Sequence, residues 1–196
     1  MKNKNEKGLL IILSGPSGVG KETVRTRLMK IKDFDLVYSV SMTTREPRNK
    51  EVDGINYYFV TQEEFKHNIE IGNFLEYAKF VGNYYGTPMD KVEALRNEGH
   101  NVLLEIEING ASQVMSKVKD DRMISFFLMP PSLKALEERI RNRKTESEEV
   151  ILERLNKGKE EMTKTQNYDY VILNDRINRA AEEIKDLIDK KLNITK

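Results

Sequence analysis

A buried strand that runs into a glycine-rich loop and then a helix is the feature that most restricts the fold of this chain. The run LLIILS (residues 9–14) is continuously apolar, as expected of a parallel strand buried on both faces. It is followed by GPSGVGKET (15–23) and by the helix-like stretch KETVRTRLMKI. The spacing of Gly15, Gly20 and Lys21 fits the phosphate-binding pattern G-x-x-x-x-G-K-[ST], which requires this strand–loop–helix context. The sequence therefore predicts an α/β protein whose loop binds phosphate groups.

The loop offers main-chain donors and one fixed charge. Its glycines let consecutive N–H groups turn toward phosphate oxygens, and the helix that follows adds its positive end. Lys21 supplies positive charge for the β- and γ-phosphates of a nucleoside triphosphate. The alternative is a glycine-rich turn without a ligand, which the intact spacing and the lysine disfavour. The residues that we expect to contact the triphosphate are Gly15, Pro16, Ser17, Gly18, Val19, Gly20, Lys21, Glu22 and Thr23.

One position departs from the motif. Where the pattern has a hydroxyl that holds Mg²⁺, this chain has Glu22. A carboxylate ~4 Å from a phosphate charge costs about 1 kcal/mol in water and about 4 kcal/mol at an effective dielectric constant of 20. We therefore expect Glu22 to point outward, while Thr23 keeps a hydroxyl on the first helical turn. Direct metal ligation by Glu22 is the alternative.

Further apolar runs alternate with helical patterns along the chain. Runs typical of buried strands occur at 101–108, 122–129 and 169–174, with amphipathic stretches between and after them. This alternation predicts a parallel sheet covered by helices. Because the 196 residues contain no repeat, linker or low-complexity tract, we expect a single domain over 1–196.

Two segments interrupt the alternation. The segment 39–88 is rich in aromatic and β-branched residues, and we expect it to form a small, mostly antiparallel β lobe. It precedes the second buried strand, beside the carboxyl ends of the strands where ligands usually bind. The segment 139–154 is dense in Arg and Glu and is a candidate mobile piece. The core would then comprise about 1–38, 89–138 and 155–196.

Composition excludes several classes of protein. A net charge of +1 gives no electrostatic reason to expect nucleic acid or a membrane as a partner. The absence of cysteine excludes disulfides and thiol chemistry and fits a reducing compartment. The apolar run near the N-terminus is too short for a signal peptide or a membrane span. We therefore expect a cytoplasmic protein, and the sequence favours no particular oligomeric state.

The 39–88 segment contains candidates for binding a second anion. Arg45 and Arg48 flank Pro47, and two guanidinium groups at this spacing suit a bidentate grip on a terminal phosphate, although exposed surface charge is an equal alternative. Glu76 lies in an otherwise apolar stretch, where an unpaired carboxylate would be costly; a salt bridge at the rim is the alternative. Hydroxyl groups in the same segment come from Ser41, Tyr57, Tyr85 and Thr87.

These motifs together resemble the guanylate kinases, which phosphorylate GMP with ATP. The likeness covers residues 8–190 and rests on GPSGVGK, SVSMTTREPR, EVDGINYYFV, FLEYAKFVGNYYGT, LLEIEINGA, RNRKTESEE and VILND. It implies the three-layer fold of P-loop nucleoside triphosphatases, with a GMP-binding lobe at 39–88 and a helical lid at 139–154. It also implies reversible, Mg²⁺-dependent transfer of the γ-phosphoryl group of ATP to GMP, with dGMP as a further acceptor.

The resemblance assigns the acceptor site residue by residue. An arginine pair and two tyrosines that hold the acceptor phosphate match Arg45, Arg48, Tyr57 and Tyr85, and the guanine-reading positions match Ser41, Glu76, Thr87 and Glu107. The chemistry agrees, because a carboxylate can accept from both N1–H and N2–H₂ of guanine, whereas adenine presents an acceptor at N1. Sites built on such hydrogen bonds reject mispaired analogues by factors on the order of 10⁴. Where the family usually has two Asp residues, this chain has Glu105 and Glu107.

The resemblance also assigns the lid and the donor side. Arg139, Arg143 and Arg154 match arginines that close over the phosphates, and Asn174 matches an adenine-side position. Transfer would need no strong general base, because the acceptor is already a phosphate oxygen. The phosphoryl charge would be shared by Lys21, Arg45, Arg143, Arg154 and Mg²⁺. Thr23 or Glu105 could hold the metal through water. Some arginines in this region should instead form helix pairs, such as Glu137 with Arg141.

Two other functions stay open at this point. The chain could phosphorylate another monophosphate, such as AMP or a pyrimidine nucleotide. It could also be a guanylate-kinase-like interaction module without catalysis. Lys21 and the loop glycines are intact, which argues against a module, and only Glu22 favours one.

Overall fold

The protein, described here by a computed structural model of residues 6–32, 35–142 and 147–194, contains two β-sheets. The larger sheet has five strands in the order β2-β7-β1-β8-β9, and every neighbouring pair is parallel. Its strands are β1 (Leu10–Ser14), β2 (Leu36–Tyr38), β7 (Asn101–Glu105), β8 (Met123–Met129) and β9 (Tyr170–Leu173). The predicted α/β architecture with a parallel central sheet is confirmed.

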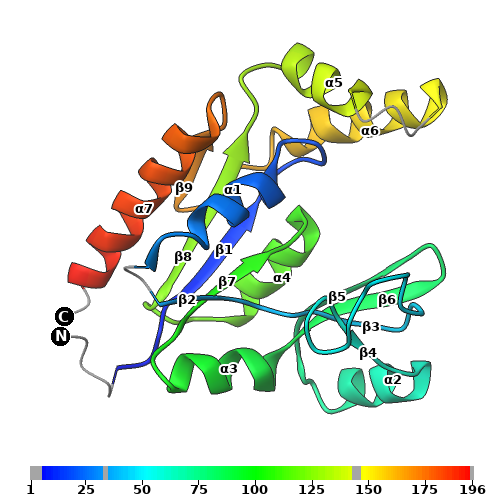
Figure 1. Cartoon of the computed structure of the whole chain (residues 1–196), viewed down its shortest axis with the longest axis vertical. Helices are drawn as coiled ribbons and strands as arrows, with labels where there is room; N and C mark the ends of the chain where they lie inside the picture. The colour runs from blue at the N-terminus through cyan, green and yellow to red at the C-terminus, as the bar shows by residue number, and fades with distance from the viewer. Residues whose placement is uncertain (1–5, 33–34, 143–146, 195–196) are drawn as a thin grey trace.

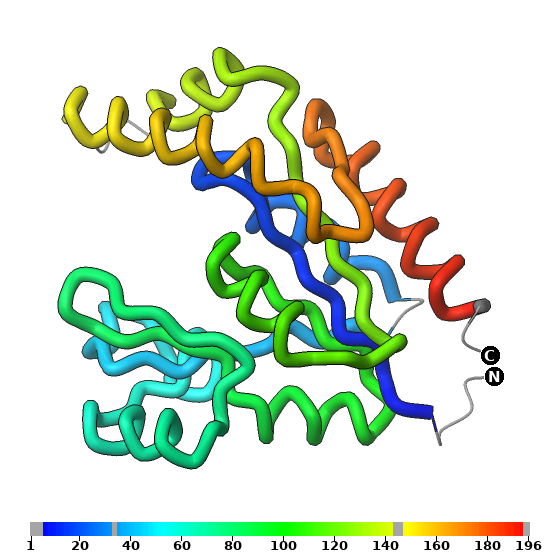
Figure 2. The backbone as a smooth tube through the Cα atoms, turned by 180° about the vertical axis from the view of Figure 1, so that it is seen from behind, coloured from blue at the N-terminus to red at the C-terminus, as the bar shows by residue number. Residues whose placement is uncertain are grey.

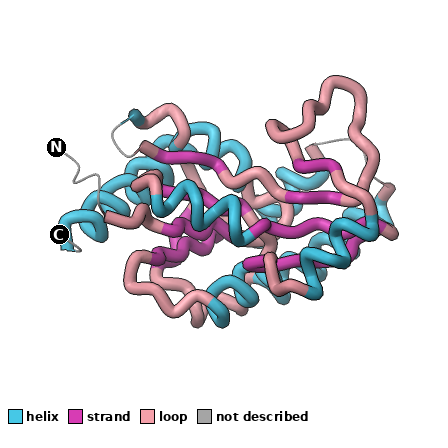
Figure 3. Tube along the Cα trace, turned by 90° about the horizontal axis from the view of Figure 1, so that it is seen from below, coloured by secondary structure: helices cyan, strands magenta, loops and turns pink. Residues whose placement is uncertain are grey.

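Helices cover both faces of this sheet, as Figures 1 and 3 show. Side chains alternate across the strand β1, so Ile11 and Leu13 pack with α1 and α7, while Leu10 and Ile12 pack with α3 and α4. Both faces of the central strand are therefore apolar, which explains the uninterrupted run in the sequence. The helices of these layers are α1 (Lys21–Leu28), α3 (Met89–Asn97), α4 (Ile108–Lys117) and α7 (Ile177–Ile194).

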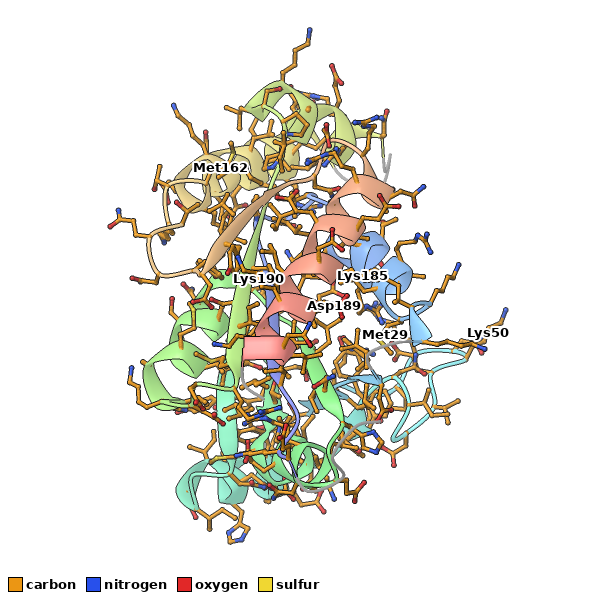
Figure 4. All side chains as sticks on the ribbon, turned by 90° about the vertical axis from the view of Figure 1, so that its left-hand side faces the viewer. Met29, Lys50, Met162, Lys185, Asp189 and Lys190 are labelled. Carbon is orange, nitrogen blue, oxygen red and sulfur yellow. The ribbon has the colours of Figure 1, made fainter. Side chains whose placement is uncertain are left out.

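The outer face of α7 is polar and charged. Lys185 and Asp189 lie one turn apart on it, and Lys185 Nζ is 2.8 Å from Asp189 Oδ2 (Figure 4). The inner face carries buried Ala180, Ile184 and Ile188. This amphipathic pattern is the one that the sequence predicts for a terminal helix covering a sheet.

The second sheet is smaller and mixed. Its order is β4-β3-β6-β5, with one parallel pair (β3 with β4) and two antiparallel pairs. Phe65 of its helix is buried and stacks on Phe74 and Tyr84, with ring centroids 4.4 and 5.3 Å apart. The elements are β3 (Met42–Thr43), β4 (Tyr58–Phe59), α2 (Gln62–Glu70), β5 (Phe74–Phe80) and β6 (Asn83–Pro88).

Two further helices, α5 (Leu133–Arg141) and α6 (Glu148–Glu161), follow β8. Figure 2 shows that this helix pair and the small sheet project from the same side of the large sheet. None of the described helices combines the length and the apolar character that a membrane span requires.

The structure corrects several predicted boundaries. The strand expected at 101–108 ends at Glu105, and Glu107 is the N-cap of α4. The strand β2 and the helix α3 are absent from the prediction. β2 has only three residues, and α3 follows β6 with no loop between them, because Pro88 both ends β6 and is the N-cap of α3. The N-terminus of α3 is capped by a residue that is distant in the sequence, because Asp90 N donates to Asn73 Oδ1 (3.0 Å).

Candidate nucleotide-binding site

The phosphate loop connects β1 to α1 and has the backbone geometry that its glycines allow. Gly15 (φ 145°) and Gly20 (φ 99°) both have positive φ values. A Cβ atom at Gly15 would lie 2.5 Å from Leu128 O, so this position has neither the conformation nor the space for a side chain. Gly20 is the N-cap of α1, and no side chain of the described residues caps this helix. Its first N–H groups are therefore free to bind an anion.

Lys21 lies over the loop that precedes it. Its Nζ donates to Gly15 O (2.7 Å) and Pro16 O (3.3 Å). Burial lowers the pKa of Lys21, and the nearby carboxylates of Glu105 and Glu107 act in the opposite direction. The ammonium group is thus held at the loop by neutral main-chain acceptors, which charged phosphate oxygens can replace.

The Glu22 side chain points away from the loop, in agreement with the expected orientation. It is 77% exposed, and Oε1 lies 3.8 Å from Arg25 Nη2. Arg25 in turn forms an ion pair with Glu105, with Nε 2.7 Å from Oε2, and lies over the Tyr38 ring at 4.4 Å. Arg25 thus separates the two carboxylates. The sequence predicts no role for this residue, although it lies one helical turn after Lys21.

Glu105 is the acidic residue at the end of β7, and its surroundings bear on a magnesium ion. Burial raises its pKa, and the charges of Arg25 and Lys21 oppose that rise. Within the described residues, no three Asp, Glu or His side chains form a metal centre. Mg²⁺ usually keeps several waters and binds through one or two carboxylates plus substrate phosphates. A single carboxylate beside the phosphate loop fits that mode.

A cavity of about 920 Å³ lies beside the loop, between α5 and the start of α7. Arg139 donates to Val19 O (2.9 Å) and Asn174 O (2.7 Å), and Asn174 Nδ2 donates to Val19 O (2.8 Å). Asn174 is buried, and its Oδ1 has no hydrogen-bond partner among the described residues. Gly18, Thr23 and both of these polar side chains line the cavity. Its size suits a nucleoside.

The α5–α6 pair brings a second arginine onto the loop, besides Arg139. Arg154 Nη2 donates to Ser17 Oγ (2.7 Å). Arg143 lies outside the described residues. Arg141 joins the two helices, because it pairs with Glu137 (2.8 Å) and with Glu148 (2.6 and 2.7 Å). The expected Glu137–Arg141 helix pair is therefore confirmed.

A second group of charged and aromatic side chains lies on the small sheet. Arg45 Nη2 donates to Glu51 Oε1 (3.0 Å), and its guanidinium lies 5.6 Å from the Tyr57 ring centroid. The rings of Tyr57 and Tyr85 are 6.1 Å apart. The structure therefore brings Arg45 and both predicted tyrosines together.

Glu51 joins the two predicted arginines. Its Oε2 accepts from the main-chain N–H of Arg48 (2.7 Å), while Oε1 accepts from the Arg45 side chain. These donors hold the pKa of Glu51 below its usual value. The sequence predicts no role for Glu51, although it lies three residues after Arg48.

Glu76 has a buried carboxylate that accepts a hydrogen bond from a neighbouring side chain. It is 8% exposed, and Thr87 Oγ1 donates to its Oε1 (2.6 Å). Burial raises its pKa, and the Thr87 hydrogen bond acts against that rise. Ser41 lies just before β3 and accepts from Tyr58 N through its carbonyl (2.9 Å). The hydrogen bond between Thr87 and Glu76 thus connects two of the predicted base-reading residues directly.

Glu107 differs from Glu76 in its surroundings. Its side chain is 72% exposed and lies 3.5 Å from Lys157 Nζ of α6. Glu107 and Glu76 are close enough for the first to raise the pKa of the second. The two carboxylates therefore border the same region from the core and from the small sheet.

Comparison with known proteins agrees with this geometry. The family model described as guanylate kinase matches residues 7–191. The chain is 51% identical to the guanylate kinase of Streptococcus agalactiae serotype III (strain NEM316), over 94% of this chain and 88% of the relative. It is 50% identical to that of Streptococcus pyogenes serotype M3 (strain ATCC BAA-595 / MGAS315), over 94% and 87%.

A solved structure is also similar. The crystal structure of guanylate kinase from Anaplasma phagocytophilum superposes with a TM-score of 0.72 at 33% identity, covering 95% of this chain and 87% of that one. The match includes the parallel core and the small mixed sheet. This chain belongs to the guanylate kinase family.

Proposed function

We propose that this chain transfers the γ-phosphoryl group of ATP reversibly to GMP, giving ADP and GDP, with the site residues assigned below. Phosphoryl transfer from ATP to GMP is the known reaction of its family. The observation that carries the assignment to GMP is the buried Glu76 carboxylate. Thr87 fixes one of its oxygens, and a carboxylate can accept from the adjacent N1–H and N2–H₂ donors of guanine.

The donor nucleotide would bind at the phosphate loop. The first N–H groups of α1 would cradle the phosphates, and Lys21 would leave its loop carbonyls to bind the β- and γ-phosphates. The adenosine would occupy the cavity beside Arg139 and Asn174. The residues proposed for ATP binding are Gly15, Pro16, Ser17, Gly18, Val19, Gly20, Lys21, Glu22, Thr23, Arg139 and Asn174.

The acceptor would bind on the small sheet. The Arg45 guanidinium, already positioned by Glu51 and the Tyr57 ring, would hold the GMP phosphate. We also propose that dGMP is accepted, because the assigned groups read the base and the phosphate rather than the ribose. The residues proposed for GMP binding are Ser41, Arg45, Arg48, Tyr57, Glu76, Tyr85, Thr87 and Glu107.

The protein's part in the reaction would be alignment and charge neutralisation. The attacking group is a phosphate oxygen of GMP, so no strong general base is needed. Lys21, Arg45 and Arg154 would surround the transferred group, and we retain Arg143 as a fourth cation. A bound Mg²⁺ would neutralise further phosphate charge, and Glu105 could hold it through water.

Residues 39–88 would form the GMP-binding unit, 139–154 the lid, and the rest the core. We place the protein in the cytoplasm, where its nucleotide substrates are found. This fits a chain without cysteine.

An assay of ADP release tests the proposal. The protein is incubated with ATP, Mg²⁺ and, in turn, GMP, dGMP, AMP, UMP and dTMP. Turnover should be fastest with GMP, follow with dGMP, and fall to background with Lys21→Ala. Preferred turnover of AMP or a pyrimidine nucleotide would instead assign a different acceptor.

A further inference from the structure

The strand β5, which carries Glu76, is irregular at that residue. Its pairing with β6 shifts between Phe74, which faces Pro88, and Glu76, which faces Thr87, so Leu75 is an extra residue in a β-bulge. In a regular strand, Phe74 and Glu76 would point to the same face, because side chains two residues apart do so. Across the bulge they face Pro88 and Thr87, which are neighbours on β6 and point to opposite faces. The bulge therefore places Glu76 on the same face as Thr87, where it is buried (8% exposed).

β5 is also an edge strand, and the helix α4 holds its outer side. Lys117 Nζ donates to Phe74 O (3.1 Å), at the start of the bulge. Gln113 Nε2 donates to Tyr77 O (3.0 Å), while Tyr77 N donates to Gln113 Oε1 (3.2 Å). These contacts satisfy main-chain groups that the disrupted edge leaves without a strand partner. They lie on both sides of Glu76 in the sequence.

One face of α4 makes all these contacts. Residues 110, 113 and 117 are spaced three and four apart, so they align along the helix. At position 110 the helix comes so close that a Cβ atom would lie 2.9 Å from Glu76 Oε2. The Glu76 region of β5 therefore packs against the helix face formed by Gly110, Gln113 and Lys117.

We propose that Lys117 is a positioning residue for guanine recognition, whose ammonium group holds the bulged strand that aims Glu76 at the purine. This inference rests on the proposed role of Glu76. Lys117 would not touch the nucleotide. Its loss would let the bulge relax and would leave the Phe74 carbonyl without this donor.

The charge of Lys117 adds a second effect. Burial raises the pKa of Glu76, and the groups that act on it from neighbouring elements are Thr87 of β6, Lys117 of α4 and Glu107 at the N-cap of α4. The Thr87 hydroxyl and the Lys117 charge favour the ionised carboxylate, and Glu107 opposes it. Guanine requires the ionised form as its acceptor. GMP affinity should be lost on acidification, when Glu76 is protonated. Without Lys117 this loss should therefore occur at a higher pH.

Steady-state kinetics of variants at Lys117, Lys119 and Glu76 test this inference. Lys117→Met should raise KM for GMP about tenfold, the order expected when a charged hydrogen bond is lost, with KM for ATP and kcat changed less than twofold. As the pH is lowered, the GMP affinity of this variant should also begin to fall at a higher pH than that of the wild type. The GMP phosphate titrates in the same way with every variant. A difference between their pH profiles therefore reports a titrating group of the protein. Lys117→Arg, which keeps the charge and a donor, should restore most of the affinity.

Lys119→Met is the matched control. It removes the same charge close by, but Lys119 Nζ contacts only the Met115 carbonyl of its own helix region among the described contacts. It should leave both KM values and the pH profile unchanged. Thermal unfolding of every variant separates misfolding from a local effect. If Lys117→Met destabilises the protein, a comparison of Lys117→Arg with Lys117→Gln tests the same loss of charge.

The outcomes distinguish this inference from the proposed function. If the wild type does not saturate with GMP, the proposed function fails. If Glu76→Gln loses GMP affinity while Lys117→Met behaves like Lys119→Met, the role of Lys117 is overturned and the proposed function stands. Equal losses for ATP and GMP would also overturn it, since they would show a general structural role.

Discussion

Glu22 and Glu76 lie close to the two halves of the proposed site, and their surroundings separate their roles. Glu22 is 77% exposed and has Arg25 at 3.8 Å, so solvent and a cation balance its charge. Glu76 is 8% exposed and accepts a hydrogen bond of 2.6 Å from Thr87. An exposed carboxylate tolerates replacement, whereas a buried one with a fixed direction can select a ligand.

Glu22→Ser restores the usual hydroxyl of the phosphate-loop motif. KM for ATP should change by less than about threefold, because the carboxylate faces solvent and its interaction with phosphate is screened. Initial rates at saturating GMP give this value, with Lys21→Ala as the control that should lose activity. A complete loss of turnover in Glu22→Ser would show that Glu22 takes part in catalysis.

Gly110→Ala tests the close approach between α4 and Glu76. The new methyl group would lie 2.9 Å from Glu76 Oε2, so the carboxylate must shift. KM for GMP should rise roughly tenfold or more, the loss expected from a misplaced charged hydrogen bond, and KM for ATP should not change.

The matched control for that variant is Ser112→Ala, an exposed position on the same helix. Alanine itself stabilises a helix by about 1 kcal/mol relative to glycine. A more stable Gly110→Ala protein with unchanged KM for GMP would therefore contradict the proposed contact.

At the scale of elements, the sequence predicts the strands of the core well because each is a continuous apolar run. It predicts β1, β8 and β9 to within one residue. The prediction for β7 runs three residues too far, because IEI continues the apolar alternation while the backbone already leaves the sheet at Glu105. The edge strand β2 has three half-buried residues and too little apolar pattern to detect.

The supporting contacts were harder to predict than the motifs they support. Arg25, Glu51 and Lys117 act on motif residues through charge and hydrogen bonds. Arg25 and Glu51 lie near their partners in the sequence. Lys117 contacts a strand 43 residues away, at a bulge that depends on the pairing of two strands. No local pattern encodes such a contact, so only the folded arrangement reveals it.

The junction between the small sheet and α3 offers a test at this scale. Asn73 accepts from Asp90 N (3.0 Å) and donates to Asp90 Oδ1 (3.1 Å) and Asn68 Oδ1 (2.9 Å). Asn73→Ala should lower the free energy of unfolding by about 1 kcal/mol, because α3 loses a cap. Urea unfolding measures this, with exposed Asn97→Ala at the other end of α3 as the control. Equal stability of both variants would exclude a capping role.

At the scale of the whole molecule, the small sheet and the α5–α6 pair project from the same side of the core (Figure 2). Arg154 already reaches the phosphate loop from α6, and Arg45 lies on the small sheet. In the proposed assignment both cations act on one phosphoryl group, so we expect the two projections to approach each other when both nucleotides are bound.

This closure should limit the access of water. With ATP and Mg²⁺ but no GMP, ATP hydrolysis should be at least about 100-fold slower than transfer to GMP, because the cations are not yet assembled around the phosphoryl group. Phosphate release and ADP release measured on one preparation give the two rates. Hydrolysis at a rate near that of transfer would contradict a closing site.

We propose that the buried Glu76 carboxylate makes this phosphate-loop kinase select guanine. The most direct test is the ratio of kcat/KM for GMP to that for AMP, measured for the wild type and for Glu76→Gln. The wild-type ratio should be on the order of 10⁴, and Glu76→Gln should lower it about 100-fold or more with KM for ATP unchanged. A Glu76→Gln enzyme that keeps the wild-type preference for GMP would contradict the claim.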